Sequence, residues 1–403
     1  MLTIGVPRET APGENRVALI PQSVQALVKA GLAVRVEAGA GAAAFFADAA
    51  YREAGATIAA SAREVYSCDV VCKVREVRER PDLGAHEADL LKDGGVLIGF
   101  LNAARDTDAV ERLVRRHVTM FAMERVPRIT RAQKMDALSS MSTVAGYKAV
   151  LLAAESLPRF FPLLMTAAGT IPPARVFVLG AGVAGLQAIA TSRRLGGVVE
   201  AFDVRPAVRE EVQSLGATFV APEAVSESAV GAGGYARELA ADQEKKMREV
   251  IAASVQNSDV VIATANVPGR KAPVMVTDEM LQKMKPGSVI IDLAAESGGN
   301  CEGTRPGQDV VRHGVTIRGP VNLAATMPVH ASQLYARNVL ALVQHLVKDA
   351  ALNLDMNDEI TRGTCLTHAG QRMDTAPAGA PAVAAAVMAP APPSDTGKVT
   401  VRP

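Results

Sequence analysis

The segment Val176–Val204 reads VFVLGAGVAGLQAIATSRRLGGVVEAFDV and begins with an unbroken apolar run, Val176–Leu179. That run is too short for a helix and is typical of a buried parallel strand. Gly180, Gly182 and Gly185 follow it in G-x-G-x-x-G spacing. In this pattern the first glycine permits a tight turn, the second lets backbone approach a pyrophosphate, and the third lets helix and strand pack closely. The segment therefore predicts a dinucleotide-binding turn between a strand and a helix.

The acidic residue that accompanies such a turn follows at the expected distance. An Ala-rich helix is expected over Leu186–Leu195, and a second apolar strand, Val198–Phe202, ends on Asp203, 18 positions beyond Gly185. Phosphates bind the N-terminus of such a helix, where N–H groups and the helix dipole attract anions. A carboxylate accepts hydrogen bonds from a ribose diol but repels a 2′-phosphate, so Asp203 favours NAD(H). Arg205 is a contrary sign, but an arginine in place of the acid would be needed to favour NADP(H).

The length and composition restrict the class of protein. The chain has 403 residues, enough for two domains, and a net charge of +1 with acids and bases interleaved. This balance gives no electrostatic reason to expect nucleic acid or an anionic bilayer as a partner. The cysteines lack metal-ligand spacing, so we expect free thiols and no metal site: Cys68, Cys72, Cys301 and Cys365.

The two ends of the chain give no sign of a membrane anchor. The N-terminus, MLTIGVPRE, lacks a basic start and a long apolar core, so we expect a strand there and not a signal peptide. No uninterrupted apolar run approaches the ~18–20 residues of a membrane helix. Residues 375–403 are rich in Ala and Pro and offer no large apolar side chains, which predicts a flexible tail.

The order of strand-like and helix-like segments predicts the fold class. Residues 1–135 alternate the two types, which indicates a parallel sheet with helices on both faces. A long helix over Ala132–Ala154 is expected to leave this domain, and residues 136–326 form a Rossmann domain around the glycine turn. A helix over Met327–Val347 then returns the chain, so residues 327–370 complete the first domain. We expect an α/β protein of two doubly wound parallel-sheet domains, the second inserted into a discontinuous first.

Several other segments match a known family. From about Leu2 to Thr367 the chain resembles the soluble NAD(H)-binding subunit, domain I, of proton-translocating NAD(P) transhydrogenase, and more distantly the alanine dehydrogenases. The most specific segments are PRETAPGENRVALIP (Pro7–Pro21), PRITRAQKMDALSS (Pro127–Ser140), MTAAGTIPPARVFVLGAGVAGLQAIATSRRLG (Met165–Gly196), KPGSVIIDLAAESGGNCE (Lys285–Glu302) and GTC (Gly363–Cys365).

The resemblance implies a function, partners and a location. In that family the subunit binds NADH and passes hydride directly to NADP⁺ held on a partner subunit, while membrane subunits couple the step to proton movement. The chain resembles the three-polypeptide version, in which this domain is a separate chain. The resemblance thus implies a homodimeric, cytoplasmic protein that is peripheral at the inner face of the membrane through its partner subunits.

Two other interpretations remain open, an alanine-type dehydrogenase and a non-catalytic NAD-sensing module. Direct hydride transfer needs positioning groups but no general acid or base, whereas an amino-acid dehydrogenase must clamp a carboxylate and shuttle protons. By resemblance, Arg16 and Lys73 correspond to substrate-binding residues of the alanine dehydrogenases. The catalytic His of that family corresponds to Asn102, and its Asp to Glu296. The missing His argues against the dehydrogenase, and Arg16 and Lys73 are then structural.

The signature R-x4-Q-x2-D-x2-S of the family is matched by Arg128, Gln133, Asp136 and Ser139. The last three lie three residues apart, so we expect them on one face of a helix. By resemblance, Arg128, Asp136 and Ser139 hold the NADH carboxamide, and Gln133 reaches the partner's NADP ribose. The alternative is a capping network at a helix N-terminus, where Asp and Ser are favoured.

Two loops complete the expected site. Small residues around GAGGY suggest a hinged lid with Tyr235, and the family has a mobile loop with a tyrosine here. Asn266 follows the apolar strand Val260–Ala263, at the edge where open α/β sheets bind ligands. We expect these residues to bind cofactor: Arg128, Ile129, Gln133, Asp136, Ser139, Gly180, Gly182, Val183, Gly185, Asp203, Val204, Arg205, Gly234, Tyr235, Asn266 and Val267.

Overall fold

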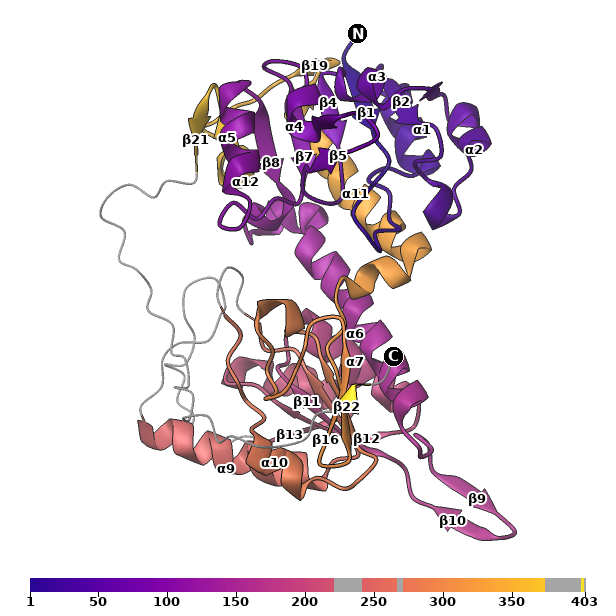
Figure 1. Ribbon diagram of the computed structural model, residues 1–403, viewed down its shortest axis with the longest axis vertical. Helices are drawn as coiled ribbons and strands as arrows, with labels where there is room; N and C mark the ends of the chain where they lie inside the picture. The colour runs from indigo at the N-terminus through magenta and orange to yellow at the C-terminus, as the bar shows by residue number, and fades with distance from the viewer. Residues whose placement is uncertain (221–240, 267–270, 374–399, 402–403) are drawn as a thin grey trace. The chain divides into compact units, whose positions relative to one another are not determined.

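The computed structural model describes residues 1–220, 241–266, 271–373 and 400–401, and these residues form two compact units (Figure 1). The first unit comprises Met1–Met141 and Ala324–Pro381, and the second comprises Ser142–Leu323 and Ala382–Pro403. The chain therefore leaves the first unit, builds the second and returns. This confirms the expected α/β fold in which one domain is inserted into another.

The sheet of the first unit has eight strands in the order β21-β20-β8-β7-β4-β1-β2-β3. The strands from β8 to β3 pair in parallel, whereas β20 is antiparallel to β8 and β21 is antiparallel to β20. Antiparallel strands at this edge were not expected. The bounds are β1 Thr3–Val6, β2 Ala33–Glu37, β3 Thr57–Ala59, β4 Val70–Cys72, β7 Val96–Gly99, β8 Thr119–Ala122, β20 Cys365–His368 and β21 Gln371–Arg372.

Helices and short elements complete the first unit. A buried cluster joins α4 and α5 to the sheet through Ala88, Val110, Leu113, Leu97 and Met120. The helices are α1 Pro21–Lys29, α2 Asp48–Glu53, α3 Ala62–Tyr66, α4 Glu87–Leu90, α5 Thr107–Arg115, α11 Pro328–Leu346 and α12 Glu359–Thr364. The shorter elements are η1 Ala42–Ala44, η2 Met123–Arg125, η3 Thr130–Met135, and the pairs β5 Glu79–Arg80 with β6 Ala85–His86 and β18 Val347–Lys348 with β19 Ala351–Leu352.

The sheet of the second unit has the order β13-β12-β11-β14-β15-β17-β16-β22. It is parallel from β13 to β17, and β16 and β22 add antiparallel pairings at one edge. The first strand, β11, lies between β12 and β14, so the strand order reverses there and creates a ligand-binding switch point. The bounds are β11 Arg175–Leu179, β12 Val198–Phe202, β13 Thr218–Phe219, β14 Val260–Ala263, β15 Val289–Asp292, β16 Asp309–Arg312, β17 Val315–Arg318 and β22 Thr400–Val401.

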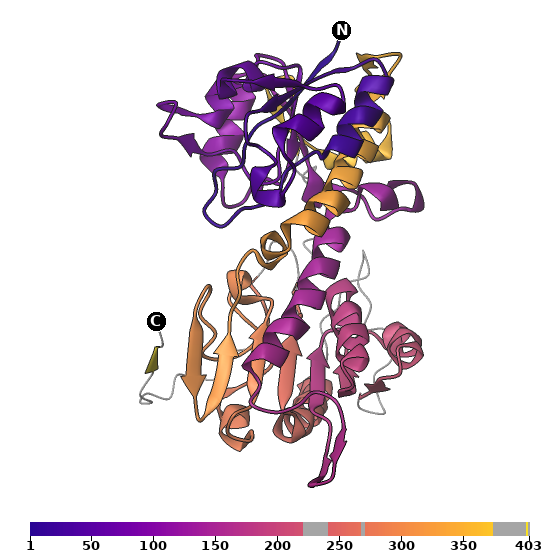
Figure 2. The same ribbon diagram turned by 90° about the vertical axis from the view of Figure 1, so that its right-hand side faces the viewer.

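Helices cover both faces of this sheet because β11 is apolar on both. Val176 and Val178 pack in one buried cluster with residues of α6 and α7. Phe177 and Leu179 pack in a second cluster with residues of α9 and α10. This alternation follows from the two-residue period of a strand, and Figure 2 shows the helices beside the strands. The helices are α6 Ala137–Ser156, α7 Val183–Arg194, α8 Arg209–Ser214, α9 Ala241–Asn257 and α10 Asp278–Lys283, with η4 Pro206–Val208, η7 Ala295–Ser297 and η8 Leu323–Thr326.

A two-stranded hairpin projects from the second unit (Figures 1 and 2). Its strands are β9 Leu164–Thr166 and β10 Gly169–Ile171, which pair only with each other. Met165 is 73% exposed and Ile171 is 43% exposed, so the hairpin carries apolar side chains into solvent.

The structure corrects two expectations about the chain's course. The helix expected over Ala132–Ala154 is two helices, η3 and α6, because the backbone at Asp136 has a non-helical ψ of 87°. The tail expected from residue 375 falls mostly outside the described residues, but Thr400–Val401 forms a short strand paired with β16.

One helix meets the length and hydropathy of a membrane span. Among the described residues this is α6, with 20 residues and a mean hydropathy of 1.2 over its best window, of which 39% is buried. The core helix of a soluble protein passes the same test, so α6 is weak evidence for a span.

Candidate functional site

The glycine turn after β11 is closely packed at two of its three glycines. Gly180 has a φ of 94°, which a residue with a side chain rarely adopts, and it lies against Thr264. A Cβ atom on Gly185 would lie 1.8 Å from the carbonyl oxygen of Gly180. Thr264 Oγ1 also donates to that carbonyl at 3.0 Å. The turn can therefore close only with glycine at both positions, as its spacing predicts.

Gly182 differs because space lies beyond it. A Cβ atom there would meet nothing within 4 Å, and Gly182 is the N-cap of the twelve-residue helix α7. Val183, the first residue of α7, is 43% exposed. The first N–H groups of a helix have no carbonyl partners within it and attract anions. The open backbone at the start of α7 fits a pyrophosphate.

Asp203 lies at the carboxyl end of β12 and is 7% exposed. Its Oδ2 accepts the backbone N–H of Ala181 at 2.8 Å, so the acid is fastened to the glycine turn. Both oxygens also accept hydrogen bonds from the guanidinium of Arg205 at 2.9 Å. Val204, between them, packs against the core under this face of the sheet. The acid is positioned beside the turn as expected, and its charge is paired with Arg205.

Asn266 is exposed and follows β14, on the same carboxyl edge as the glycine turn and Asp203. The three segments meet there because the parallel strands β12, β11 and β14 are adjacent. Val267, Gly234 and Tyr235 lie outside the described residues.

Asn300 is a residue of this region that the sequence did not single out. It is completely buried, and its Nδ2 donates at 2.8 Å to the carbonyls of both Ala265 and Pro273. These two carbonyls flank the segment that contains Asn266. The backbone N–H of Asn300 donates in turn to Asp292 at 2.7 Å, at the end of β15. Asn300 thus fixes both ends of the loop, and its separation of 35 residues from Ala265 hides this role in the sequence.

The loop that contains Arg128 and Gln133 borders a hollow of the first unit. The volume of this hollow is about 410 Å³, and it is lined by Pro127, Arg128, Ile129, Thr130, Ala132, Gln133 and Asp136. Ala132 and Met135 are buried, and Asn338 of α11 donates to the carbonyl of Lys134 at 2.8 Å. The loop is therefore anchored from below while Arg128 and Gln133 remain exposed.

Asp136 caps the start of α6. Its Oδ1 accepts the backbone N–H of Ser139 at 2.9 Å, and its Oδ2 accepts the Ser139 hydroxyl at 2.6 Å. The expectation that Gln133, Asp136 and Ser139 share one helix face is wrong, because this cap separates η3 from α6. The capping network considered as an alternative is present, and Asp136 lines the hollow as well.

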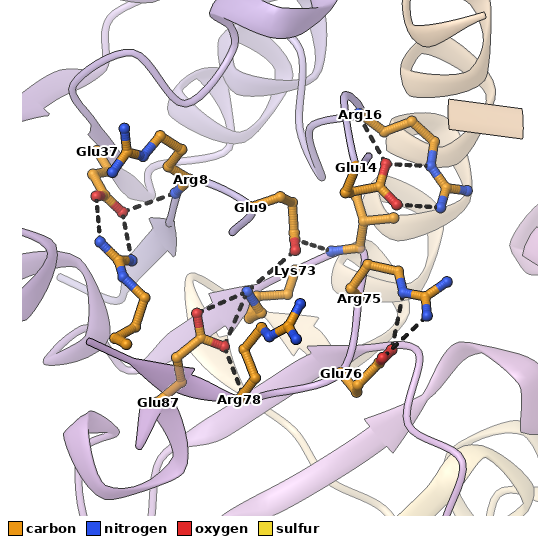
Figure 3. A network of polar contacts seen from close by, with 12 residues as sticks. Arg8, Glu9, Glu14, Arg16, Glu37, Lys73, Arg75, Glu76, Arg78 and Glu87 are labelled. Carbon is orange, nitrogen blue, oxygen red and sulfur yellow. Dashed lines mark hydrogen bonds and ion pairs between the residues drawn. The ribbon is translucent and has the colours of Figure 1, made fainter. Parts of the chain in front are cut away.

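A buried ionic network surrounds Lys73 in the first unit (Figure 3). Lys73 is 1% exposed, and its Nζ lies 3.3 Å from Glu9 and 3.2 Å from Glu87. Burial would lower the pKa of Lys73, but the charge of Glu9, with smaller effects from Tyr66 and Glu87, outweighs burial and raises it. The ammonium is therefore charged and is shared between two carboxylates.

The second cation of this region, Arg16, is also paired. Its Nε and Nη2 donate to the two carboxylate oxygens of Glu14 at 2.7 and 2.6 Å, and Arg16 is 4% exposed. Asn102 uses its side-chain oxygen to accept the N–H of Ala104 at 3.2 Å. A carboxylate substrate would have to compete with Glu14, Glu9 and Glu87 for these cations.

Metal chemistry has no support in the described residues, where no group of three or more His, Cys, Asp or Glu side chains is arranged to hold an ion. The four cysteines are buried and free. Each set of binding residues therefore offers hydrogen-bond donors, acceptors and charges for holding a ligand.

Comparison with known proteins identifies the family. The model of the alanine dehydrogenase/PNT N-terminal domain matches residues 5–145, and that of the C-terminal domain matches residues 149–375. The first portion of NAD(P) transhydrogenase subunit alpha of Rhodospirillum rubrum, a separate polypeptide, is 48% identical over 373 residues, which cover 92% of this chain and 97% of the relative.

Two further relatives bear on the alternative interpretations. The crystal structure of transhydrogenase from Sinorhizobium meliloti superposes with a TM-score of 0.83 at 44% identity, and the match covers 92% of this chain and 99% of that one. Alanine dehydrogenase 2 of Staphylococcus aureus is 34% identical over 335 residues, which cover 81% of this chain and 82% of the relative.

Proposed function

Because this chain belongs to the alanine dehydrogenase/PNT family, we propose that it is the NAD(H)-binding subunit of a proton-translocating NAD(P) transhydrogenase. It passes hydride directly between NADH, which it binds, and NADP⁺, which a partner subunit holds. The observation that carries this proposal is the combination of an open glycine turn with a paired Asp203 and no catalytic His at Asn102.

The chemistry of the proposed reaction agrees with the groups present. The nicotinamide supplies the hydride, and no proton moves at the reacting carbons, so the protein must hold and orient rings but needs no acid or base. The start of α7 binds the pyrophosphate and Asp203 accepts the ribose hydroxyls. Arg128, Asp136 and Ser139 hold the carboxamide, while the exposed Gln133 reaches the NADP ribose on the partner.

The alternative, an alanine-type dehydrogenase, agrees less well with the buried network. Such an enzyme needs free cations to clamp a carboxylate and a titratable group to move protons. Lys73 is shared between two carboxylates, Arg16 is paired with Glu14, and Asn102 cannot exchange a proton near neutral pH. We therefore assign Arg16 and Lys73 a structural role.

The proposed reaction requires partners. Residues that move protons across a membrane lie on membrane-embedded subunits, and NADP(H) lies on an NADP-binding subunit. This chain then works as a cytoplasmic protein held at the inner face of the membrane by those subunits.

We further propose that the chain is a homodimer that associates through the β9–β10 hairpin. The exposed apolar residues of this segment are Phe160, Leu163, Met165 and Ile171, with exposed fractions of 54, 53, 73 and 43%. Apolar residues gathered on a projecting hairpin are typical of an association surface. Met165→Asp should shift the sedimentation coefficient to that of a monomer, whereas a dimer that persists in this variant places the contact elsewhere.

Hydride transfer in a reconstituted complex tests the function. Purified chain, NADH and an NADP analogue should give no reaction until the NADP-binding subunit is added. Alanine with NAD⁺ should give no turnover in either mixture. Alanine-dependent reduction of NAD⁺ by this chain alone would establish the dehydrogenase instead, and NADH binding without transfer in the complex would favour the non-catalytic module.

A further inference from the structure

A second hollow of the first unit lies between η2 and α12. Its volume is about 430 Å³, and it is lined by Arg125, Asn357, Glu359, Arg362, Gly363 and Met373. Small-molecule sites have volumes of about 300–1,000 Å³, so this hollow is large enough for a metabolite. Gly363 lies against Pro127, with 3.5 Å between a Cβ atom built on Gly363 and the proline ring. The hollow therefore adjoins the loop of Gln133 but does not include it.

The two arginines of this hollow form no ion pair with any residue that the structure describes. Arg125 and Arg362 differ in this respect from Arg131, which lies 2.9 Å from Asp358. The Nε–H of Arg125 is buried and has no hydrogen-bond partner among the described residues. A buried donor without a partner costs about 1–3 kcal/mol, so such a group in a native protein needs an explanation.

A bound oxyanion provides that explanation. A guanidinium presents a planar fork of N–H donors that matches the oxygens of a phosphate. Two such forks on one hollow can hold two or three phosphate oxygens. Glu359 is the only carboxylate in the lining, so the lining carries a net charge of +1 from two arginines and one glutamate. Glu359 and Asn357 can accept hydrogen bonds from hydroxyl groups, as a sugar would offer.

We propose that this hollow is a binding site for a phosphate monoester of about the size of a sugar phosphate. Arg125 and Arg362 bind the phosphate group, and Glu359 and Asn357 contact the hydroxylated part. The ligand differs from the dinucleotide at α7 because the hollow belongs to the first unit and contains no helix start of comparable length. Occupation would brace Gly363 against Pro127 and so steady the loop of Gln133.

Calorimetric titration of the full chain tests this site. The titrations use ribose 5-phosphate and, separately, inorganic phosphate, both with saturating NADH so that the start of α7 is occupied. Binding of both ligands with similar affinity indicates a phosphate site, and tighter binding of the ester adds the contacts of Glu359 and Asn357. Arg362→Gln should weaken either ligand about 10-fold or more, because one charged fork is lost.

Two further variants make the outcome decisive. Arg131→Gln removes a nearby positive charge that does not line the hollow, so it should leave the affinity for phosphate unchanged. Glu359→Gln should tighten inorganic phosphate several-fold, because a repelling carboxylate is removed. No saturable binding, or equal weakening by Arg362→Gln and Arg131→Gln, would overturn the proposal. NADH titration of each variant checks that the chain is folded.

Discussion

Asp203 and Arg205 form a two-point ion pair at the carboxyl end of β12, in which Nε and Nη2 of the arginine each lie 2.9 Å from a carboxylate oxygen. The pair is mostly withdrawn from solvent, with 7% of Asp203 and 24% of the Arg205 side chain exposed. The sequence placed these residues in opposition, one favouring NAD(H) and the other NADP(H). In the structure they neutralise each other, so selectivity depends on how far ribose hydroxyls displace the guanidinium.

Substitution of either residue should change cofactor selectivity in opposite directions. We expect the wild-type chain to bind NADH at least ~100-fold more tightly than NADPH, which corresponds to about 2.7 kcal/mol. Asp203→Ala should remove most of this preference, because Arg205 is then a free cation beside the ribose. Arg205→Ala should increase the preference by freeing the carboxylate. Calorimetric titration of both nucleotides measures the ratio, and equal affinities in the wild type would contradict the assignment of Asp203.

Gly182 and Gly185 form a matched pair that separates ligand binding from packing. Gly182→Ala adds a methyl group to open space, so the melting temperature should stay within error while NADH affinity falls by about 10-fold or more. Gly185→Ala forces a Cβ to 1.8 Å from the Gly180 carbonyl, so it should also destabilise the protein by several degrees. Normal NADH binding by Gly182→Ala would show that the pyrophosphate lies elsewhere.

Local patterns predicted the insertion of one α/β domain into another and the strands around the glycine turn. The apolar run before Gly180 and the acid at Asp203 are signals within one continuous segment, and the structure confirms the strand, turn, helix and strand. The ligand contacts of the site residues remain predictions.

Features that depend on distant contacts were not predictable. The break between η3 and α6 depends on one carboxylate turning back to cap Ser139, while the apolar periodicity continues through it. The direction of β16 and β20 depends on which strand each meets across the chain. Asn300 acts on Ala265 from 35 residues away, so no local motif marks it.

Glu124 should make stability depend on pH near neutrality. Burial raises the pKa of Glu124 from 4.5 to about 7 in the folded state. Between these values the unfolded chain loses the proton first, so the wild-type free energy of unfolding falls as pH rises from 5 to 8. Glu124→Gln cannot lose a proton and keeps an acceptor for the N–H of Leu101. Its advantage over the wild type should therefore grow with pH by up to about 3 kcal/mol.

Glu76 supplies the control for this measurement. Burial would raise the pKa of Glu76, but backbone hydrogen bonding and Arg75 together lower it below the usual range. Its contribution is lost only as pH falls through that pKa, so Glu76→Gln should differ from the wild type by a constant amount between pH 6 and 8. Denaturant unfolding at several pH values measures both differences. A constant difference for Glu124→Gln as well would mean that Glu124 is already ionised at pH 5.

Lys73 should be needed for stability and not for NADH binding. Lys73→Met leaves Glu9 and Glu87 buried without their cation, which should cost about 3–5 kcal/mol. Lys92→Met removes a cation that is 55% exposed and paired with Asp69, and should cost no more than about 1 kcal/mol. Denaturant unfolding compares the two, and NADH titration is done under conditions where both variants are folded. A small loss of stability in Lys73→Met together with a loss of activity would show a functional lysine.

Gln133 and Asp136 line the same hollow, but the proposed function gives them different partners. Gln133 is exposed, so Gln133→Ala should leave NADH affinity nearly unchanged and slow hydride transfer in the assembled complex by ~10-fold or more, as misplaced rings would. Arg128→Ala and Asp136→Ala should instead weaken NADH by roughly 1–3 kcal/mol, because a group on the nicotinamide side loses its hydrogen-bond partner.

The capping role of Asp136 demands one more control, because its removal also frees the N–H of Ser139. Asp136→Asn keeps an acceptor for that N–H, so it should retain the melting temperature while NADH affinity still falls. NADH titration of the isolated chain, beside single-turnover transfer after the NADP-binding subunit is added, separates the two effects. If Gln133→Ala lost NADH affinity as severely as Arg128→Ala, Gln133 would contact NADH and not the nucleotide of the partner.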